Sequence, residues 1–261
     1  MMGFAQHVGK GALAIVDAAG QIVLLLADVC RCLFRYPIRW RLLRQQIVFV
    51  GSSSMMVVMV TGIFIGAVFA AQTQFYFGPL GMNSAVGPTV AVSMCREFGP
   101  VICALMISGR VGAALAAELG TMKITEQIDA LRSLAVYPTE YLIVPRVLAL
   151  VISMPLLVGW AIFLGIGAGY LVFTQVAGVD GTYYWDNTLK FTDMKDVSFG
   201  LAKALVFGVI IALVGCQKGL NSGHGAEGVG RATTEAVVNA SLTVLVFNFF
   251  LSLLFNYLFT D

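Results

Sequence analysis

Charged side chains are scarce in this sequence. Asp, Glu, Lys and Arg make up 11% of the 261 residues, whereas 59% are hydrophobic. None of the four occurs between Gln45 and Cys95, a stretch of 51 residues. A helix needs about 20 apolar residues to cross a bilayer, so this stretch alone is long enough for two crossings. We therefore predict an all-α integral membrane protein with no nucleic-acid partner.

The common motifs of catalysis and cofactor binding are absent as well. The sequence has no GxxxxGK[ST] loop for ATP, no GxSxG nucleophile and no HExxH metal site. Its cysteines lack CxxC spacing and stand in or beside apolar segments, which favours packing over disulfides or metal. We expect no catalytic residue, metal or cofactor in this chain. The cysteines are Cys30, Cys32, Cys95, Cys103 and Cys216.

The first 44 residues differ from the rest. Charges such as Asp17 and Asp28 interrupt them, so no uncharged run within 7–34 reaches spanning length. This pattern predicts an amphipathic helix that lies in the membrane interface. Five arginines follow between 31 and 44; they suit anionic headgroups on the cytoplasmic side, or they act only as a topology signal. We predict 1–44 as an interfacial helix with a basic segment.

Residues 45–261 predict a domain of five membrane spans. Gly/Pro signals around Pro79 and Pro88 mark the first turn, and the uncharged segment 73–88 is either a periplasmic loop or re-entrant. The third span is rich in glycine, which permits close helix approach. An acidic polar loop at 175–198 and a Gly-rich loop at 217–235 separate the later spans. The predicted spans are 47–72, 89–117, 147–174, 199–216 and 236–259.

The basic residues orient this arrangement. Twelve lie on one side, and only Lys190 and Lys195 lie on the other. Because Lys and Arg accumulate in cytoplasmic loops, the N-terminus is predicted to be cytoplasmic and the C-terminus periplasmic. The twelve are Lys10, Arg31, Arg35, Arg39, Arg41, Arg44, Arg110, Lys123, Arg132, Arg146, Lys218 and Arg231.

A compact charged segment at 118–137 separates the second and third spans. Ile124, Ile128 and Leu131 recur at helical spacing and predict one apolar face, with polar residues on the other side. Tyr137 before a proline is the predicted end of this helix. A short amphipathic helix in the cytoplasm is suited to docking on a partner.

Three charges fall inside predicted spans: Arg96, Glu97 and Lys203. A charge in the middle of the membrane costs roughly 2.5 to 3.5 kcal/mol on insertion scales, so these groups need a partner or a wet cavity. They form either the polar floor or gate of a substrate cavity, or a Glu97–Lys203 ion pair that joins two helices. Asn248 in the last span is expected to hydrogen-bond between helices.

The docking helix, the missing ATP-binding loop and the charges inside the spans together suggest a transporter whose substrate cavity is driven by a separate ATPase. Two other functions remain possible on the sequence alone. The first is an ion-coupled secondary transporter that uses Glu97 and Lys203 as a proton or ion relay, although we find no internal repeat. The second is a membrane scaffold without transport.

Several sequence strings resemble the MlaE/YrbE family of ABC-transporter permeases. That resemblance implies an interfacial helix followed by five spans, a homodimer in the inner membrane, and transport of phospholipids to or from a periplasmic MCE-domain carrier. It also implies a separate cytoplasmic ATPase dimer that binds ATP-Mg, and a small STAS-type accessory subunit. The strings are REFGPV (96–101), GRVG (109–112), AAELGTM (116–122), TEQIDAL (125–131), PR (145–146) and GRATT (230–234).

The resemblance also assigns roles to residues. It makes the segment 118–137 a coupling helix seated in a groove of the ATPase. Asn248 stands where the family often has an acidic residue, so a charged role there does not carry over. The implied coupling residues are Glu118, Thr125, Glu126, Gln127, Asp129 and Arg132, and the residues that we expect at the lipid cavity from their place inside the spans are Arg96, Glu97, Lys203 and Asn248.

Overall fold

The computed structural model describes the backbone of residues 2–35, 37–175, 178 and 180–259. All regular structure in these residues is helical, which confirms the all-α class. Both ends of the chain and the side chain of Lys10 lie outside the description. The α-helices are α1 Met2–Arg35, α2 Trp40–Phe77, α3 Val86–Ser93, α4 Gly99–Ile107, α5 Ala113–Ile124, α6 Gln127–Ser133, α7 Val144–Gln175, α8 Gly181–Phe191, α9 Met194–Leu220 and α10 Gly225–Phe259.

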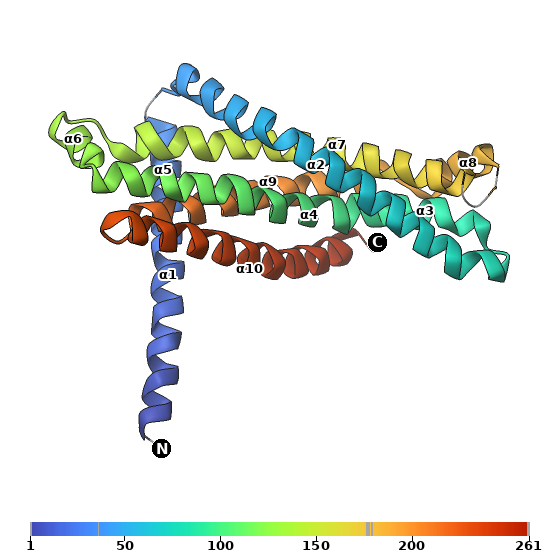
Figure 1. The fold of residues 1–261 in the computed structure, drawn as a ribbon, viewed down its shortest axis with the longest axis horizontal. Coiled ribbons are helices and arrows are strands. Elements are labelled where there is room, and N and C mark those ends of the chain that lie inside the picture. Colours follow the sequence, from blue (N-terminus) through green and yellow to red (C-terminus); the bar gives the residue numbers. More distant parts are fainter. Residues whose placement is uncertain (1, 36, 176–177, 179, 260–261) are drawn as a thin grey trace.

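Five helical segments among the described residues are long and apolar enough to cross a membrane, as predicted. They run along the long axis of the molecule, with α6 at one end and α8 at the other; we call these the α6 end and the α8 end (Figure 1). α3, α4 and α5 join through two π-turns into one segment, which we call span 2. The segments are Trp40–Leu80, Asn83–Ile124, Thr139–Gln175, Met194–Leu220 and Gly225–Leu258.

The helices extend beyond the predicted spans, and the loop predicted at 217–235 is mostly helix. α9 continues to Leu220 and α10 begins at Gly225, so only four residues form the turn. The turn is tight because Gly228 lies against Gly223: a Cβ on Gly228 would be 2.4 Å from the carbonyl carbon of Gly223. Gly223 and Gly228, two of the glycines that predicted a loop, therefore serve close backbone packing.

The acidic loop predicted at 175–198 contains helix α8. Asp180 caps this helix by accepting a hydrogen bond from the Thr182 amide at 2.9 Å. Tyr184 is buried and its ring lies 5.2 Å from that of Phe173 on α7. Burial of Tyr184 holds α8 against the bundle, whereas the sequence shows mainly its exposed polar residues. Burial also raises the pKa of the Tyr184 hydroxyl.

The uncharged segment 73–88 forms a compact turn at the α8 end. It contains two 3₁₀ turns, Gly78–Leu80 and Asn83–Ala85, and α3 begins directly afterwards. Gly81 between them has φ of 72°, a left-handed conformation that glycine adopts without strain.

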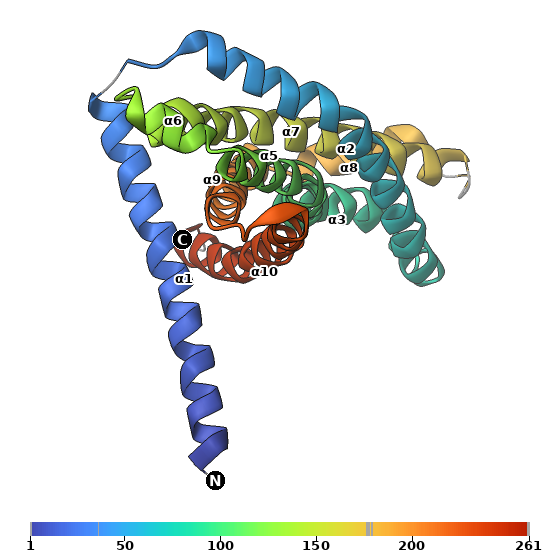
Figure 2. The ribbon, with the colours of Figure 1, turned by 60° about the vertical axis from the view of Figure 1, so that its left-hand side comes forward.

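Helix α1 runs across the bundle rather than along it, and its N-terminal part extends away from the other helices (Figures 1 and 2). It packs on the bundle through buried Val29 and Cys32. Burial, followed by the nearby carboxylates of Asp28 and Glu140, raises the pKa of the Cys32 thiol. This thiol therefore stays protonated and packs as a small apolar group.

The glycines of the third span support only part of the predicted close packing. Gly165 is in contact with α2, because a Cβ on Gly66 of α2 would lie 2.1 Å from the Gly165 carbonyl oxygen. Gly169 is close to the hydroxyl of Tyr184. At Gly159 and Gly167 an added Cβ would have nothing within 4 Å, so their predicted role in helix approach is wrong.

Candidate functional site

A cluster of polar groups lies where span 2, α9 and α10 meet, and its first member is a backbone carbonyl oxygen of span 2 that has no α-helical donor. Pro100 has no amide hydrogen, so the carbonyl of Arg96, four residues earlier, lacks its α-helical donor. The π-turn Met94–Phe98 stands at this point, and Lys203 Nζ of α9 donates to the Arg96 carbonyl oxygen at 2.8 Å. A proline in span 2 thus creates the acceptor that a lysine of another helix satisfies.

Lys203 is fully paired. Its side chain is 2% exposed, and besides the Arg96 carbonyl it contacts Glu97 Oε1 at 2.8 Å and Ser252 Oγ at 2.8 Å. These three partners match the three hydrogens of an ammonium group. The close approach of α9 to span 2 depends on Gly200, where a Cβ would lie 2.1 Å from the Cys95 carbonyl oxygen.

Glu97 connects three helices. Its Oε1 pairs with Lys203 of α9, and its Oε2 accepts a hydrogen bond from Asn248 Nδ2 of α10 at 2.9 Å. Ser252 Oγ, one turn further along α10, lies 2.8 Å from Glu97 Oε1. The Glu97 side chain remains 42% exposed, so the cluster has one open side. Sequence reasoning missed Ser252, although its position four residues after Asn248 places both on one helix face.

Arg96 does not point into this cluster. Its guanidinium pairs with Asp196 in the first turn of α9 and lies over the Phe199 ring, 5.4 Å from the ring centroid. Only its main-chain oxygen contributes to the cluster. The Arg96 side chain therefore lies apart from the Glu97–Lys203 pair. Its partner was missed because Asp196 belonged to a predicted loop.

The cluster is a neutral, hydrogen-bonded junction of span 2, α9 and α10. A Glu97–Lys203 ion pair is present, as one of the two sequence interpretations expected. Removing one member of the pair alone would leave the other charge uncompensated, so loss of either Glu97 or Lys203 should destabilise this junction. The carbonyl oxygen Oδ1 of Asn248 is buried and has no partner among the described residues. Asn248 thus orients the carboxylate without adding charge.

The predicted helix over 118–137 is interrupted. α5 ends at Ile124 and α6 begins at Gln127, because Glu126 adopts a left-handed conformation with φ of 57°. The break turns the chain back onto the bundle, which buries Ile128 in the core and brings Leu131 against it. A straight helix would carry both side chains into water, so the hydrophobic gain outweighs the backbone strain.

The expected coupling residues divide between two environments. Glu118 lies on α5, is itself 48% exposed, and pairs with the buried Arg146 of α7 at 2.9 Å, so it joins two spans. The other five are exposed at the α6 end, where Asp129 and Arg132 pair with each other at 2.9 Å. Leu134 beside them is 73% exposed. Together, Thr125, Glu126, Gln127, Asp129, Arg132 and Leu134 form what we call the α6 surface.

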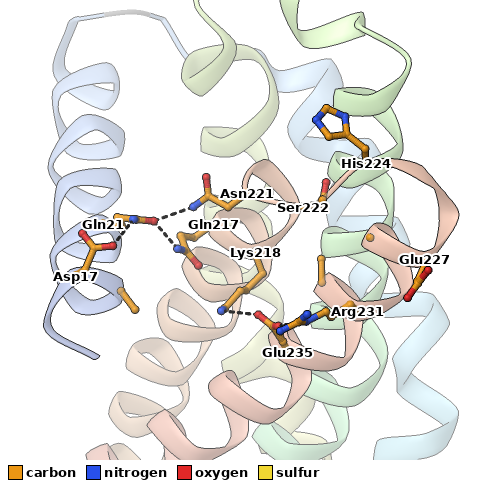
Figure 3. Close-up of a pocket in the computed structure, with 14 residues that line it drawn as sticks. Asp17, Gln21, Gln217, Lys218, Asn221, Ser222, His224, Glu227, Arg231 and Glu235 are labelled. Carbon is orange, nitrogen blue, oxygen red and sulfur yellow. Dashed lines mark hydrogen bonds and ion pairs between the residues drawn. The ribbon is translucent and has the colours of Figure 1, made fainter. Parts of the chain in front are cut away.

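A cavity of about 590 Å³ opens near the α6 end between α1, α9 and α10 (Figure 3). Gln21 of α1 accepts hydrogen bonds from Gln217 of α9 and from Asn221 directly after it, both at 2.8 Å, and these hold α1 to the bundle. On the α10 side of the cavity, Glu235 pairs with Lys218 and Arg231, each at 2.9 Å. The single carboxylate of Glu235 thus bridges the two cations of the cavity, and the trio keeps a net charge of +1.

Comparison with known proteins agrees with this architecture. The profile of the family described as "Permease MlaE" matches residues 43–254. A "Probable ABC transporter permease protein" of Rickettsia felis is 40% identical over 98% of both chains. The "Intermembrane phospholipid transport system permease protein MlaE" of Haemophilus influenzae is 34% identical over 97% of both chains. The Arabidopsis thaliana protein "TRIGALACTOSYLDIACYLGLYCEROL 1, chloroplastic" is 34% identical over 96% of this chain and 69% of its own length.

These matches cover all five segments that are long enough to cross a membrane, together with the polar cluster and the α6 surface. The chain is a multi-pass membrane protein and belongs to the MlaE permease family of ABC transporters.

Proposed function

We propose that this chain is the permease subunit of an ABC transporter that moves phospholipids between the inner membrane and a periplasmic MCE-type carrier. The family match and the name of the Haemophilus relative support lipid as the substrate. The observation that carries the proposal is the α6 surface: a charged, exposed helix-turn at one end of five spans, in a sequence without a P-loop. ATP-Mg is bound by a separate ATPase dimer.

The α6 end is cytoplasmic in this proposal. The basic residues predicted to be cytoplasmic concentrate at this end, as they do in membrane proteins generally. Helix α1, which runs across the bundle there, lies along the inner membrane surface with its N-terminus on the cytoplasmic side. α8 and the C-terminus face the periplasm, where the MCE-domain partner binds.

Motion of the ATPase reaches the membrane through span 2. The α6 surface docks in the ATPase, and α5 leads from it directly into α4 and the Glu97 cluster. Glu118 ties α5 to Arg146, so α7 moves with span 2. Closure of the ATPase dimer then tilts these helices together, and the open side of the Glu97 cluster faces a lipid cavity.

The permease acts as a homodimer in this scheme. Only 11% of the apolar stretch of α10 that could cross the membrane is buried, against 61% of the corresponding stretch of α9. An outer face of this kind is available for a second copy and for lipid chains. A cavity between two copies accommodates the two acyl chains of a phospholipid. A small STAS-type subunit completes the complex on the cytoplasmic side.

Reconstitution tests the proposal against its rival. Vesicles that contain the permease, its ATPase and the MCE-domain carrier should transfer phospholipid only with hydrolysable ATP. An ion-coupled transporter would instead work without nucleotide and respond to the membrane potential. Transfer that persists without the ATPase would contradict the proposed function.

A further inference from the structure

The cavity between α1, α9 and α10 has the size of a ligand site. Its volume of about 590 Å³ falls within the range of roughly 300 to 1,000 Å³ that small-molecule pockets occupy. Charged and amide side chains gather on its walls (Figure 3). None of its lining residues belongs to the α6 surface or to the Glu97 cluster. A ligand that binds here would therefore occupy a second site.

The cavity walls carry charges of both signs. Three carboxylates and two cations line it, which leaves an excess of one negative charge when histidine is neutral. On the α10 side, the Lys218 ammonium group has three hydrogens and uses one of them for Glu235. On the α1 side, the Asp17 carboxylate accepts a hydrogen bond from Gln21 at 2.9 Å and has room for more. The carboxylates are those of Asp17, Glu227 and Glu235, and the cations are Lys218 and Arg231.

A buried amide on the cavity wall lacks a donor. Gln217 is 7% exposed, and its Nε2 donates to Gln21 of α1, but its Oε1 has no hydrogen-bond partner among the described residues. A buried acceptor without a donor is unfavourable, so a ligand with N–H groups would be stabilised beside it. The α1 side of the cavity thus offers a carboxylate and a free amide oxygen, and the α10 side offers an ammonium group.

Helix α1 places this cavity at the level of lipid headgroups. Four exposed apolar residues of α1 form one stripe along the helix. Asp17 and Gln21 lie about a quarter-turn round the helix from that stripe, at roughly 100° per residue. With the stripe in the acyl chains, as in the interfacial position proposed above, both residues point sideways among the headgroups. A headgroup in the cavity then leaves its acyl chains in the bilayer. The stripe residues, each 63 to 70% exposed, are Leu13, Val16, Val23 and Leu24.

We infer that this cavity holds the headgroup of a zwitterionic phospholipid with a primary ammonium group, such as phosphatidylethanolamine. The phosphate binds Lys218, and the ammonium group binds Asp17 and supplies the donor that Gln217 lacks.

The walls disfavour the other common headgroups. An anionic headgroup such as that of phosphatidylglycerol meets an excess of negative charge, and a choline headgroup has no N–H group to donate. A lipid bound here joins α1 to the bundle, because its headgroup contacts both α1 and α9. This role goes beyond the proposed function: it requires the interfacial position of α1 but no transport.

Native mass spectrometry of the purified permease tests this site. Wild type in detergent is incubated with phosphatidylethanolamine, phosphatidylcholine or phosphatidylglycerol of identical acyl chains. We expect it to retain phosphatidylethanolamine about fivefold more than either other lipid. Asp17→Asn keeps an acceptor for Gln21, and Lys218→Gln leaves Glu235 paired with Arg231, so both variants should fold. Each should reduce retention of phosphatidylethanolamine about tenfold, the scale of one charge-assisted hydrogen bond.

Two further variants separate this site from lipid bound elsewhere. Ala18→Phe fills the cavity from α1 with every charge in place, so lipid that it still retains is bound at another site. Asp186→Asn removes an exposed carboxylate on α8, at the opposite end of the molecule, and should behave as wild type.

Equal retention of the three lipids by wild type overturns the inference, as does unchanged retention of phosphatidylethanolamine in Asp17→Asn and Lys218→Gln. Displacement of the lipid by free phosphoethanolamine at equal concentration also overturns it, because the occupant would then be a soluble molecule. ATP-driven transfer is measured separately and decides the proposed function whatever this site retains.

Discussion

The ammonium group of Lys203 on α9 lies 2.8 Å from the main-chain oxygen of Arg96 on span 2. Pro100 makes that oxygen available, because it removes the amide that would otherwise hold it. The same ammonium neutralises Glu97. One lysine within the membrane therefore donates to a carbonyl oxygen that lacks its helical donor and also pairs with an acidic side chain. Through these two contacts the sequence of span 2 determines where α9 lies.

Lys203→Met should destabilise the permease. The substitution leaves Glu97 without its cation and the Arg96 carbonyl without a donor, and losing one partner of such a pair costs about 3 kcal/mol, the low end of the usual range because Glu97 is partly exposed. Thermal unfolding in detergent should show the loss. An unchanged melting temperature would mean that the pair contributes nothing to stability.

The double variant Glu97→Gln with Lys203→Met separates structure from transport. Both charges are gone, so much of the lost stability should return. If the carboxylate serves the lipid cavity, ATP-driven transfer should remain low in this stable protein. Full recovery of transfer would show that the cluster is only a structural joint.

Charge reversal on the α6 surface should uncouple the ATPase. The double variant Glu126→Lys with Asp129→Lys should reduce the amount of ATPase that co-purifies with the permease about tenfold or more, because mismatched charges at an interface cost several kcal/mol. Asp186→Lys, an exposed acidic residue on α8, is the matched control and should not change ATPase binding. Normal binding and turnover in the double variant would remove α6 from the docking site.

Gly200→Ala should weaken the contact between α9 and span 2. Its Cβ would lie 2.1 Å from a backbone oxygen, so the helices must separate, and overpacking of this kind costs roughly 1 to 3 kcal/mol. Gly159→Ala, with open space at its Cβ, should be neutral or slightly stabilising. Equal melting temperatures for the two variants would contradict the close approach.

Cysteine labelling tests the orientation. In a background without the native cysteines, Asp186→Cys on α8 should react with a membrane-impermeant maleimide in intact spheroplasts. Gln127→Cys on α6 should react only after the membrane is opened. The reverse pattern would invert the topology and place the α6 surface away from any cytoplasmic ATPase.

Apolar patterning predicted the five spans well, because membrane-crossing helices need long uncharged runs regardless of their neighbours. It also brought Glu97 and Lys203 to a similar depth, since charges inside the membrane need partners. These features depend on residues close in sequence, or on a requirement that every membrane protein shares.

Features that depend on packing were missed. Nothing near Glu126 in the sequence signals a left-handed residue; burial of Ile128 imposes it. The partner of Arg96 lies 100 residues away, at a helix start hidden in a polar segment. Tyr184 fixes α8 through contacts with α7 that no local pattern shows. In each case a contact between distant segments outweighs the local preference.

Because α1 runs across the bundle, it can be used to estimate how far other residues lie from one membrane surface. If α1 marks one membrane surface, that surface meets α9 near Gln217, which Gln21 of α1 contacts. Lys203 is 14 residues further along α9, about 21 Å at a rise of 1.5 Å per residue, and so beyond the midplane of a hydrocarbon core about 30 Å thick. The Glu97 cluster and α1 then belong to opposite leaflets, so a lipid that passes from one to the other has crossed the membrane.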